Sequence, residues 1–136
     1  MASLSTTCAI SLWPTSGGYK NLLIEDNLIA VNAVNSILIN GGQENVVIQN
    51  NSLIENADGG AMIVLHAKSG MDNSGVTVSG NVARLLADQT GKSNIEDNYF
   101  YGRDADLSSI FQGNGDTWQD FLPVDGSKAE NYGALD

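Results

Sequence analysis

The sequence is poor in basic residues, and this scarcity limits what the chain can bind. Its 136 residues include 6 Lys and Arg against 16 Asp and Glu, so the formal net charge is −10. Proteins that bind nucleic acid need a Lys- and Arg-rich surface to neutralise phosphates, so we expect no nucleic-acid partner. Two interpretations of the acidity stay open: solubility, or binding of a cation or a cationic partner.

Other residue types that mark particular protein classes are also scarce. The single cysteine, Cys8, excludes an internal disulfide framework and fits a small buried apolar residue. No apolar run approaches the ~20 residues of a membrane-spanning helix, so we expect no membrane partner. The first dozen residues lack the basic segment of a secretory signal, and their apolar stretch ends at Trp13-Pro14. The chain is therefore expected to be cytoplasmic, or to be a secreted or virion-associated piece of a larger protein.

What the sequence does contain fits one domain of short strands and tight turns. The chain is 42% hydrophobic and 16% charged, which is typical of globular rather than disordered proteins. Its 15 glycines, with many Asn and Ser residues, supply turns.

An internal repeat predicts the architecture. The segment 21–27 (NLLIEDN) matches 45–51 (NVVIQNN) at a spacing of 24 residues, and the match continues until 37–39 lies over 61–63. A third copy, 75–81 (GVTVSGN), follows after 30 residues, and a fourth, 94–98 (NIEDN), after 17. The segment 8–12 resembles the apolar strand of a preceding coil, so we expect the array to begin part-way round a turn.

Each repeat has the period-2 alternation of a strand with one buried face, as in Leu22 with Ile24 and Val46 with Ile48. The apolar runs are too short for ordinary helices. One coil alone cannot bury its inner face, but coils stacked at about 4.8 Å bury it continuously. We therefore predict an all-β fold: a short parallel β-helix of about four coils.

An asparagine recurs at one corner of the predicted coils. Stacked asparagines hydrogen-bond one another and tolerate the left-handed backbone of a bend. We expect such a ladder from Asn27, Asn51, Asn81 and Asn98.

On the motifs IEDN, IQNN, VSGN and IEDN, residues 8 to 103 resemble the right-handed parallel β-helix superfamily. That superfamily includes pectate-lyase-like enzymes, alginate-epimerase-like modules and phage tailspikes. The resemblance implies the fold and its right-handedness, whereas the repeat encodes stacking rather than an active site.

The predicted β-helix covers residues 1–103, and an irregular tail covers 104–136. The last spacing, 17 residues, is too short for a full three-strand coil, so we expect either an abbreviated turn there or the end of the stack. We expect the tail to fold over the end of the stack and to cover it with Phe111, Trp118, Phe121 and Leu122. If an end stays bare, the chain is expected to form a homo-oligomer through it.

The carboxylates suggest two kinds of site, an acid/base pair and a set of metal ligands. Glu25 and Glu96 share a column but lie three coils, about 14 Å, apart, whereas glycoside hydrolysis needs about 5–9.5 Å. Asp58 and Asp88 fall at matching positions of adjacent coils, where calcium shared with Asn56 is one expectation and two ordinary turn residues are the other. No cofactor is required.

Two further candidates remain. His66, the only histidine, is either a general base near Lys68 or a solvent-facing strand-end residue. Tyr99 and Tyr101 flank Phe100, so an inward Phe100 puts both tyrosines on one outward face. Such a pair is a stacking platform for sugar rings, unless the tail packs over both rings and buries them. We expect the other members of this carbohydrate site to be Arg84, Arg103 and Trp118.

Three functional hypotheses follow. The leading one is a non-catalytic β-helix module that binds carbohydrate, as a polysaccharide or oligosaccharide, or serves as a structural spacer related to larger polysaccharide-processing proteins. The second is a small lyase- or epimerase-like enzyme whose site forms between subunits, because no catalytic cluster is visible within one chain. The third is a purely structural protein such as an assembly factor.

Overall fold

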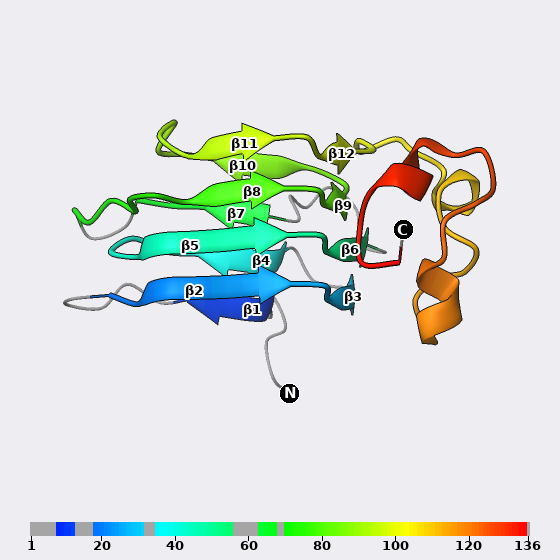
Figure 1. The fold of residues 1–136 in the computed structure, drawn as a ribbon, viewed down its shortest axis with the longest axis horizontal. Helices are drawn as coiled ribbons and strands as arrows, with labels where there is room; N and C mark the ends of the chain where they lie inside the picture. Colours follow the sequence, from blue (N-terminus) through cyan, green and yellow to red (C-terminus); the bar gives the residue numbers. More distant parts are fainter. Residues whose placement is uncertain (1–7, 13–17, 32–34, 56–62, 68–69, 136) are drawn as a thin grey trace.

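The computed structural model describes residues 8–12, 18–31, 35–55, 63–67 and 70–135, and these form a short parallel β-helix with a lateral tail (Figure 1). Three four-stranded sheets make up its faces. Sheet A contains β1 (Cys8–Leu12), β4 (Asn35–Ile39), β7 (Ile63–Leu65) and β10 (Leu86–Asp88). Sheet B contains β2 (Lys20–Glu25), β5 (Glu44–Gln49), β8 (Thr77–Ser79) and β11 (Asn94–Glu96). Sheet C contains β3 (Leu28–Val31), β6 (Ser52–Glu55), β9 (Val82–Ala83) and β12 (Tyr99–Phe100).

The chain visits sheets B, C and A in turn, and every strand pairs in parallel with the equivalent strand of the next coil. The prediction of an all-β parallel β-helix is confirmed. β1 pairs with β4, with Ile10 beside Ile37, so the described array begins part-way round a turn, as expected.

Two details of the predicted repeat are wrong. Ile37 pairs with Ile63 rather than with residue 61, because two additional residues precede β7 in the second coil. The 17-residue spacing also suffices for a full coil, since it holds β8, β9 and β10. Strands of only two or three residues joined by short turns make this coil compact.

The interior of the coils is filled by stacked aliphatic columns. In sheet B, Ile24, Ile48 and Val78 lie in one register column, and Ile48 and Val78 are completely buried. Sheet A contributes Ile37, Ile39, Ile63 and Leu65 to the same core, all at 0% exposure. Burying one such side chain stabilises the fold by about 1.5–3 kcal/mol, so stacking of coils, rather than any single coil, holds the structure together.

The predicted asparagine ladder is present at the corner between sheets B and C. The side-chain oxygen of Asn51 accepts from the backbone N–H and the amide of Asn27, at 3.0 and 2.9 Å. Asn81 does the same for Asn51, and Asn98 for Asn81, at the same two distances.

The left-handed backbone of this bend lies one residue earlier than expected. Positive φ values occur at Asp26 (56°), Asn50 (54°), Gly80 (67°) and Asp97 (54°), the residues before the ladder. This separation has a physical reason: the residue before the corner takes the strained conformation, which Asn, Asp and Gly tolerate, while the ladder asparagine is free to turn its amide into the stack.

The tail runs along the side of the stack and does not lie across its end, so the expected place of the tail is wrong (Figure 1). It contains three 3₁₀ helices, η1 (Leu107–Ser109), η2 (Trp118–Phe121) and η3 (Lys128–Asn131). Its Phe111 and Phe121 are buried against Ile54 and Val82, which face outward from sheet C. The tail is therefore part of a second apolar core on the outer face of sheet C.

Close approach of the tail backbone to sheet C depends on two glycines. A Cβ on Gly115 would lie 2.4 Å from the Cβ of Ala30, and a Cβ on Gly133 would lie 2.3 Å from the Oγ of Ser52. Both glycines also have positive φ, at 97° and 86°, so a larger residue would meet both a clash and backbone strain.

Candidate functional site

The three sheets differ in how far their outward side chains reach solvent. On sheet C, Ile54 and Val82 are 0% and 1% exposed, and on sheet A, Val64 is 6% exposed. On sheet B, Leu23 is 58% exposed. Among the described outward-facing large apolar side chains of the three sheets, Leu23 on sheet B is the most exposed.

The predicted tyrosine platform lies on the covered face of sheet C. Phe100 packs against the interior core and both tyrosines project outward, as expected. The hydroxyl of Tyr101 donates to the carbonyl of Leu53 at 2.8 Å, and its ring packs edge-on against Phe111. Burial raises the pKa of Tyr101, and the Coulombic attraction of Arg84 opposes this only in part. Tyr101 therefore stabilises the junction between stack and tail.

Tyr99 is half-buried at the same junction. Its ring centroid lies 6.3 Å from that of Tyr132 and 6.4 Å from that of Tyr101, and the ammonium of Lys128 lies 5.3 Å from its ring centre. The flat face of Tyr99 is thus already in contact with the tail.

Arg84 is a buried cation that holds backbone carbonyls. Its guanidinium donates to the carbonyls of Glu55 (2.7 Å), Gly102 (3.2 Å) and Arg103 (2.7 Å). It also lies 5.3 Å from the centre of the Tyr101 ring. Since Arg84 is only 7% exposed, its charge serves to fix the start of the tail on the last coil.

Of the two remaining members of the predicted carbohydrate groove, Arg103 adjoins Arg84 through its backbone carbonyl, and Trp118 lies elsewhere. Arg103 is exposed beyond β12. Trp118, 56% exposed, lies on η2, in the part of the tail beside the first coils, where Gly115 contacts Ala30 (Figure 1). The structure thus brings Arg84, Tyr99, Tyr101 and the backbone of Arg103 together but leaves Trp118 at another place on the surface.

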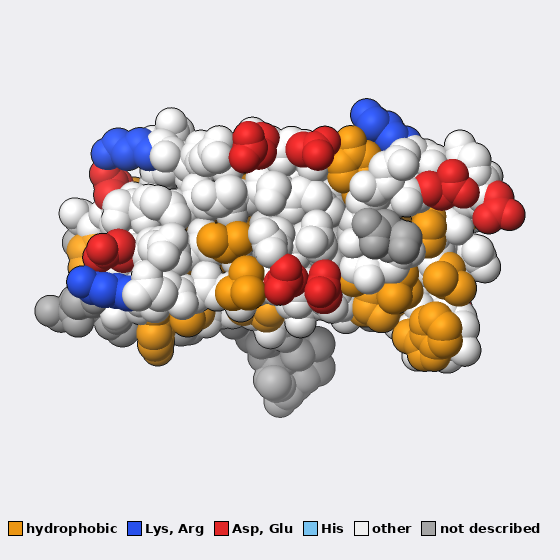
Figure 2. All heavy atoms as spheres, viewed as in Figure 1, with side chains coloured by type: hydrophobic (Ala, Val, Ile, Leu, Met, Phe, Trp, Pro, Cys, Tyr) orange, Lys and Arg blue, Asp and Glu red, His pale blue; other side chains and the backbone are white. Residues whose placement is uncertain are grey.

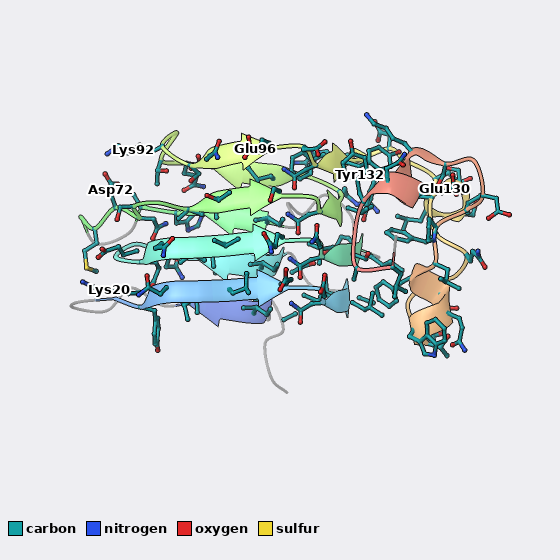
Figure 3. All side chains as sticks on the ribbon, in the orientation of Figure 1. Lys20, Asp72, Lys92, Glu96, Glu130 and Tyr132 are labelled. Atoms are coloured by element: carbon teal, nitrogen blue, oxygen red, sulfur yellow. The ribbon has the colours of Figure 1, made fainter. Side chains whose placement is uncertain are left out.

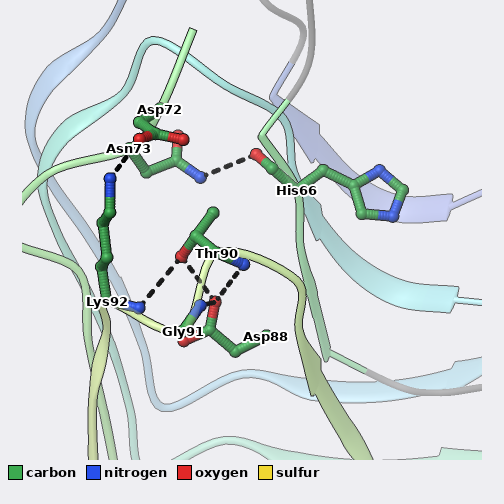
Figure 4. Close-up of polar contacts among 7 residues, drawn as sticks. All are labelled: His66, Asp72, Asn73, Asp88, Thr90, Gly91 and Lys92. Atoms are coloured by element: carbon green, nitrogen blue, oxygen red, sulfur yellow. Dashed lines mark hydrogen bonds and ion pairs between the residues drawn. The ribbon is translucent and has the colours of Figure 1, made fainter. Parts of the chain in front are cut away.

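Asp88 closes a turn. Its carboxylate accepts from the backbone N–H groups of Thr90 and Gly91 and from the Thr90 hydroxyl (Figure 4). It also accepts from the backbone N–H of Ser93. Burial alone would raise the pKa of Asp88, but these hydrogen bonds outweigh burial and lower the pKa.

The expected match between Asp88 and Asp58 is not supported by the register. Asp88 pairs with Leu65 in the preceding coil, whereas Asp58 and Asn56 lie outside the described residues. Within the described part of the chain, no group of three or more His, Cys, Asp or Glu residues is placed to hold a metal ion. The calcium expectation at this pair stays a prediction.

His66 lies at the end of β7, and its imidazole points away from the neighbouring polar groups (Figure 4). Its backbone carbonyl accepts from the amide of Asn73 at 3.0 Å. Nearby, Lys92 forms an ion pair with Asp72 that joins two loops. Lys68, the other member of the general-base hypothesis, is not among the described residues.

The outer face of sheet B has an apolar centre with polar rows beside it. Leu23 lies in register with Val47, and Val47 with Thr77. On one side the amide of Asn45 donates to Asn21 at 2.8 Å, and on the other the amide of Gln49 donates to Glu25. The signal that sequence reasoning missed is Leu23, an aliphatic residue at an outward position between the inward Leu22 and Ile24.

In the two columns nearest the ladder, carboxylates are confined to the end coils, whereas Glu44 lies at the start of β5 and is paired with Lys20. The column next to the ladder reads Glu25, Gln49, Ser79 and Glu96, as predicted. The adjoining left-handed column begins with Asp26 and ends with Asp97, with neutral Asn50 and Gly80 between them. Figure 2 shows acidic side chains near both ends of the stack on this face, and these two columns are neutral in the middle and negative at the ends.

No helix among the described residues is both long enough and apolar enough to span a membrane. Comparison with protein-family models found no matching family, and comparisons with curated proteins and with solved structures found no match. What is established is the architecture of the chain itself: three parallel sheets stacked as a β-helix.

Proposed function

We propose that this chain is a non-catalytic β-helix module that binds a neutral carbohydrate chain on the outer face of sheet B. The observation that supports this is the open apolar strip of Leu23 and Val47 between rows of amide and hydroxyl groups. Sugar rings present an apolar C–H face and peripheral hydroxyls, which match an apolar centre with hydrogen-bonding groups around it. The proposal includes a relationship to the pectate-lyase-like, alginate-epimerase-like and tailspike-like superfamily.

Charge argues for a neutral rather than an acidic polysaccharide. The polymer would cross or approach the carboxylates of Glu25 and Asp26 at one end of the face and of Glu96 and Asp97 at the other. A polyuronate would be repelled by these groups and by the net charge of −10.

The test is affinity electrophoresis in gels that contain neutral polysaccharides (xylan, mannan, mixed-linkage glucan) or acidic ones (pectate, alginate). We expect retardation in at least one neutral gel and loss of it in the double variant Leu23→Ser, Val47→Thr. The matched control is Trp118→Ser, which removes another exposed apolar side chain and should leave retardation unchanged. Retardation that depends on Trp118 but not on Leu23 would place binding elsewhere and refute the proposed face.

The second candidate function is a structural spacer, and a different observation favours it. The polar side chains that suggested chemistry are engaged by the fold: Arg84 and Tyr101 hold backbone carbonyls, and Asp88 closes a turn. If no polysaccharide retards the chain and no acidic polysaccharide is cleaved, as followed by absorbance of unsaturated products, the spacer is the function that remains.

A further inference from the structure

We propose that the two ends of this β-helix are complementary docking surfaces for a second copy of the chain, and that carboxylates on the end coils oppose this head-to-tail stacking. This inference rests on the fold and is independent of carbohydrate binding. No described segment lies across either end, since the tail packs beside sheet C (Figure 1).

The core column of sheet B is exposed at the last coil. Along sheet B the inward residues Ile24, Ile48, Val78 and Ile95 are 8%, 0%, 0% and 37% exposed. Ile95 has the inward orientation of a core residue but no coil above it. Another coil of the same kind would bury it, and the strand edges of β11 would gain the hydrogen bonds that an unpaired edge lacks.

The hydrogen bonds of the asparagine ladder all run in one direction along the stack. In each step, the backbone N–H and amide of one asparagine donate to the side-chain oxygen of the next coil's asparagine. Asn98 is the last acceptor, and its own amide turns back to the carbonyls of Val78 and Glu96. At the other end, Asn27 donates but, within the ladder, accepts nothing. Asn27 of a second copy placed on the last coil would supply the side-chain oxygen that continues the ladder beyond Asn98.

Carboxylates lie on the two end coils, where two stacked copies would meet. In such a stack, Glu25 of one copy would lie over Glu96 of the other, and Asp26 over Asp97, at the strand spacing of about 4.8 Å. Like charges directly opposite one another in a sheet are destabilising. The same two columns inside the chain hold only Gln49 with Asn50 and Ser79 with Gly80, so carboxylates occur where copies would meet and are absent where coils already meet.

The other charged groups near these columns do not offset the repulsion. Lys20 pairs with Glu44, and Lys92 with Asp72 (Figure 3). From the tail, the Tyr132 hydroxyl donates to Asp97 at 3.3 Å, Lys128 lies over the Tyr99 ring, and η3 also carries Glu130. Each described lysine is therefore already paired with a carboxylate or a ring.

The test is the quadruple variant Glu25→Gln, Asp26→Asn, Glu96→Gln, Asp97→Asn. These substitutions give both end coils the side chains of the interior Gln49-Asn50 pair, and asparagine tolerates the left-handed positions. We expect light scattering at low salt to show a mass that rises with protein concentration well beyond two chains, whereas the unmodified chain stays at the mass of one. The control, Asp104→Asn, Asp116→Asn, Asp125→Asn, Glu130→Gln, removes four exposed tail carboxylates and should also stay at the mass of one chain.

Variants of a single end separate head-to-tail from head-to-head association. Glu25→Gln with Asp26→Asn alone, or Glu96→Gln with Asp97→Asn alone, removes one partner of every like-charge pair, so each should form open-ended oligomers. The unmodified chain provides a check that needs no substitution: association should increase from low salt to about 1 M salt, where charges are screened beyond ~3 Å. The proposal would be overturned by any of three results: association that stops at dimers, equal association of the tail control, or a quadruple variant that stays folded at the mass of one chain.

Discussion

Removing the centre of the asparagine ladder should destabilise the fold far more than removing an exposed asparagine pair. The side chain of Asn81 is completely buried and makes five hydrogen bonds. It donates to the carbonyls of Ile48 and Ser79 and to Asn98, and it accepts from the backbone and amide of Asn51. Asn81→Ala removes all five and leaves buried or partly buried polar groups in three coils without these partners.

The magnitude follows from the cost of each lost contact. A typical hydrogen bond contributes about 0.5–1.5 kcal/mol, and a buried group left unsatisfied costs about 1–3 kcal/mol. Because the five bonds share one amide, we expect a total loss of about 3–5 kcal/mol, which is a large part of the ~5–15 kcal/mol that stabilises an ordinary domain.

The assay is urea denaturation followed by circular dichroism, with Asn45→Gly as the matched control. Asn45 has a φ of 54° and its exposed amide bonds only to Asn21. Glycine adopts this φ without strain and already occupies the equivalent position, Gly75, in the next coil. We expect the control to lose less than about 1 kcal/mol. A loss below about 1 kcal/mol for Asn81→Ala would refute the view that the ladder stabilises the stack.

Other buried polar contacts give further expectations. Arg84→Met should lower the free energy of unfolding by about 2–4 kcal/mol because three carbonyls lose a buried donor. Trp118→Ser should change it by less than about 0.5 kcal/mol. Equal losses of the two variants in urea denaturation would contradict the structural role of Arg84. Tyr101→Phe should cost about 1 kcal/mol. Burial raises the pKa of Tyr101, so this tyrosine should not ionise while the chain is folded. In a pH titration followed by phenolate absorbance, the variant and the unmodified chain should therefore give the same curve until alkaline unfolding. A difference between the curves in the folded range would count against burial of the hydroxyl. Because the pKa of Asp88 is lowered in the folded chain, its carboxylate stabilises the fold at pH values above the ordinary carboxyl pKa. This stabilisation is lost as the pH falls through the folded-state pKa. Asp88→Asn should therefore lose less stability between pH 7 and pH 3 in urea titrations, and an equal loss would show that Asp88 does not contribute.

The repeat predicted the architecture because the residues that make it are the ones that stacking requires. Asn27, Asn51, Asn81 and Asn98 recur because each amide must meet the next, and the alternation of Leu22 with Ile24 shows which side is inside. Spacing alone predicted the register less well. Additional residues before β7 move Ile37 onto Ile63, and no local pattern shows on which side of an apolar run an insertion falls.

The candidate site was harder to predict because it depends on contacts between distant segments. The outward direction of Tyr99 and Tyr101 follows from strand alternation, and the structure agrees. Whether an outward face meets solvent or another segment is a tertiary property. Here the 3₁₀ helices of the tail, which have no periodic sequence signal, decide it.

The burial of β6 shows why the tail packs on sheet C. A strand with one face in the core and the other in water alternates apolar with polar residues, whereas β6 is buried at all four of its positions, including the adjacent Leu53 and Ile54. An apolar residue beside an inward one needs a covering element outside the coil. In sheet C this cover is supplied by Phe111 and Phe121; in sheet B the equivalent outward residue, Leu23, is left 58% exposed. The outward apolar residues of sheet C are covered by the tail, whereas Leu23 is not covered in this way. We therefore expect an external ligand to bind to the Leu23 face.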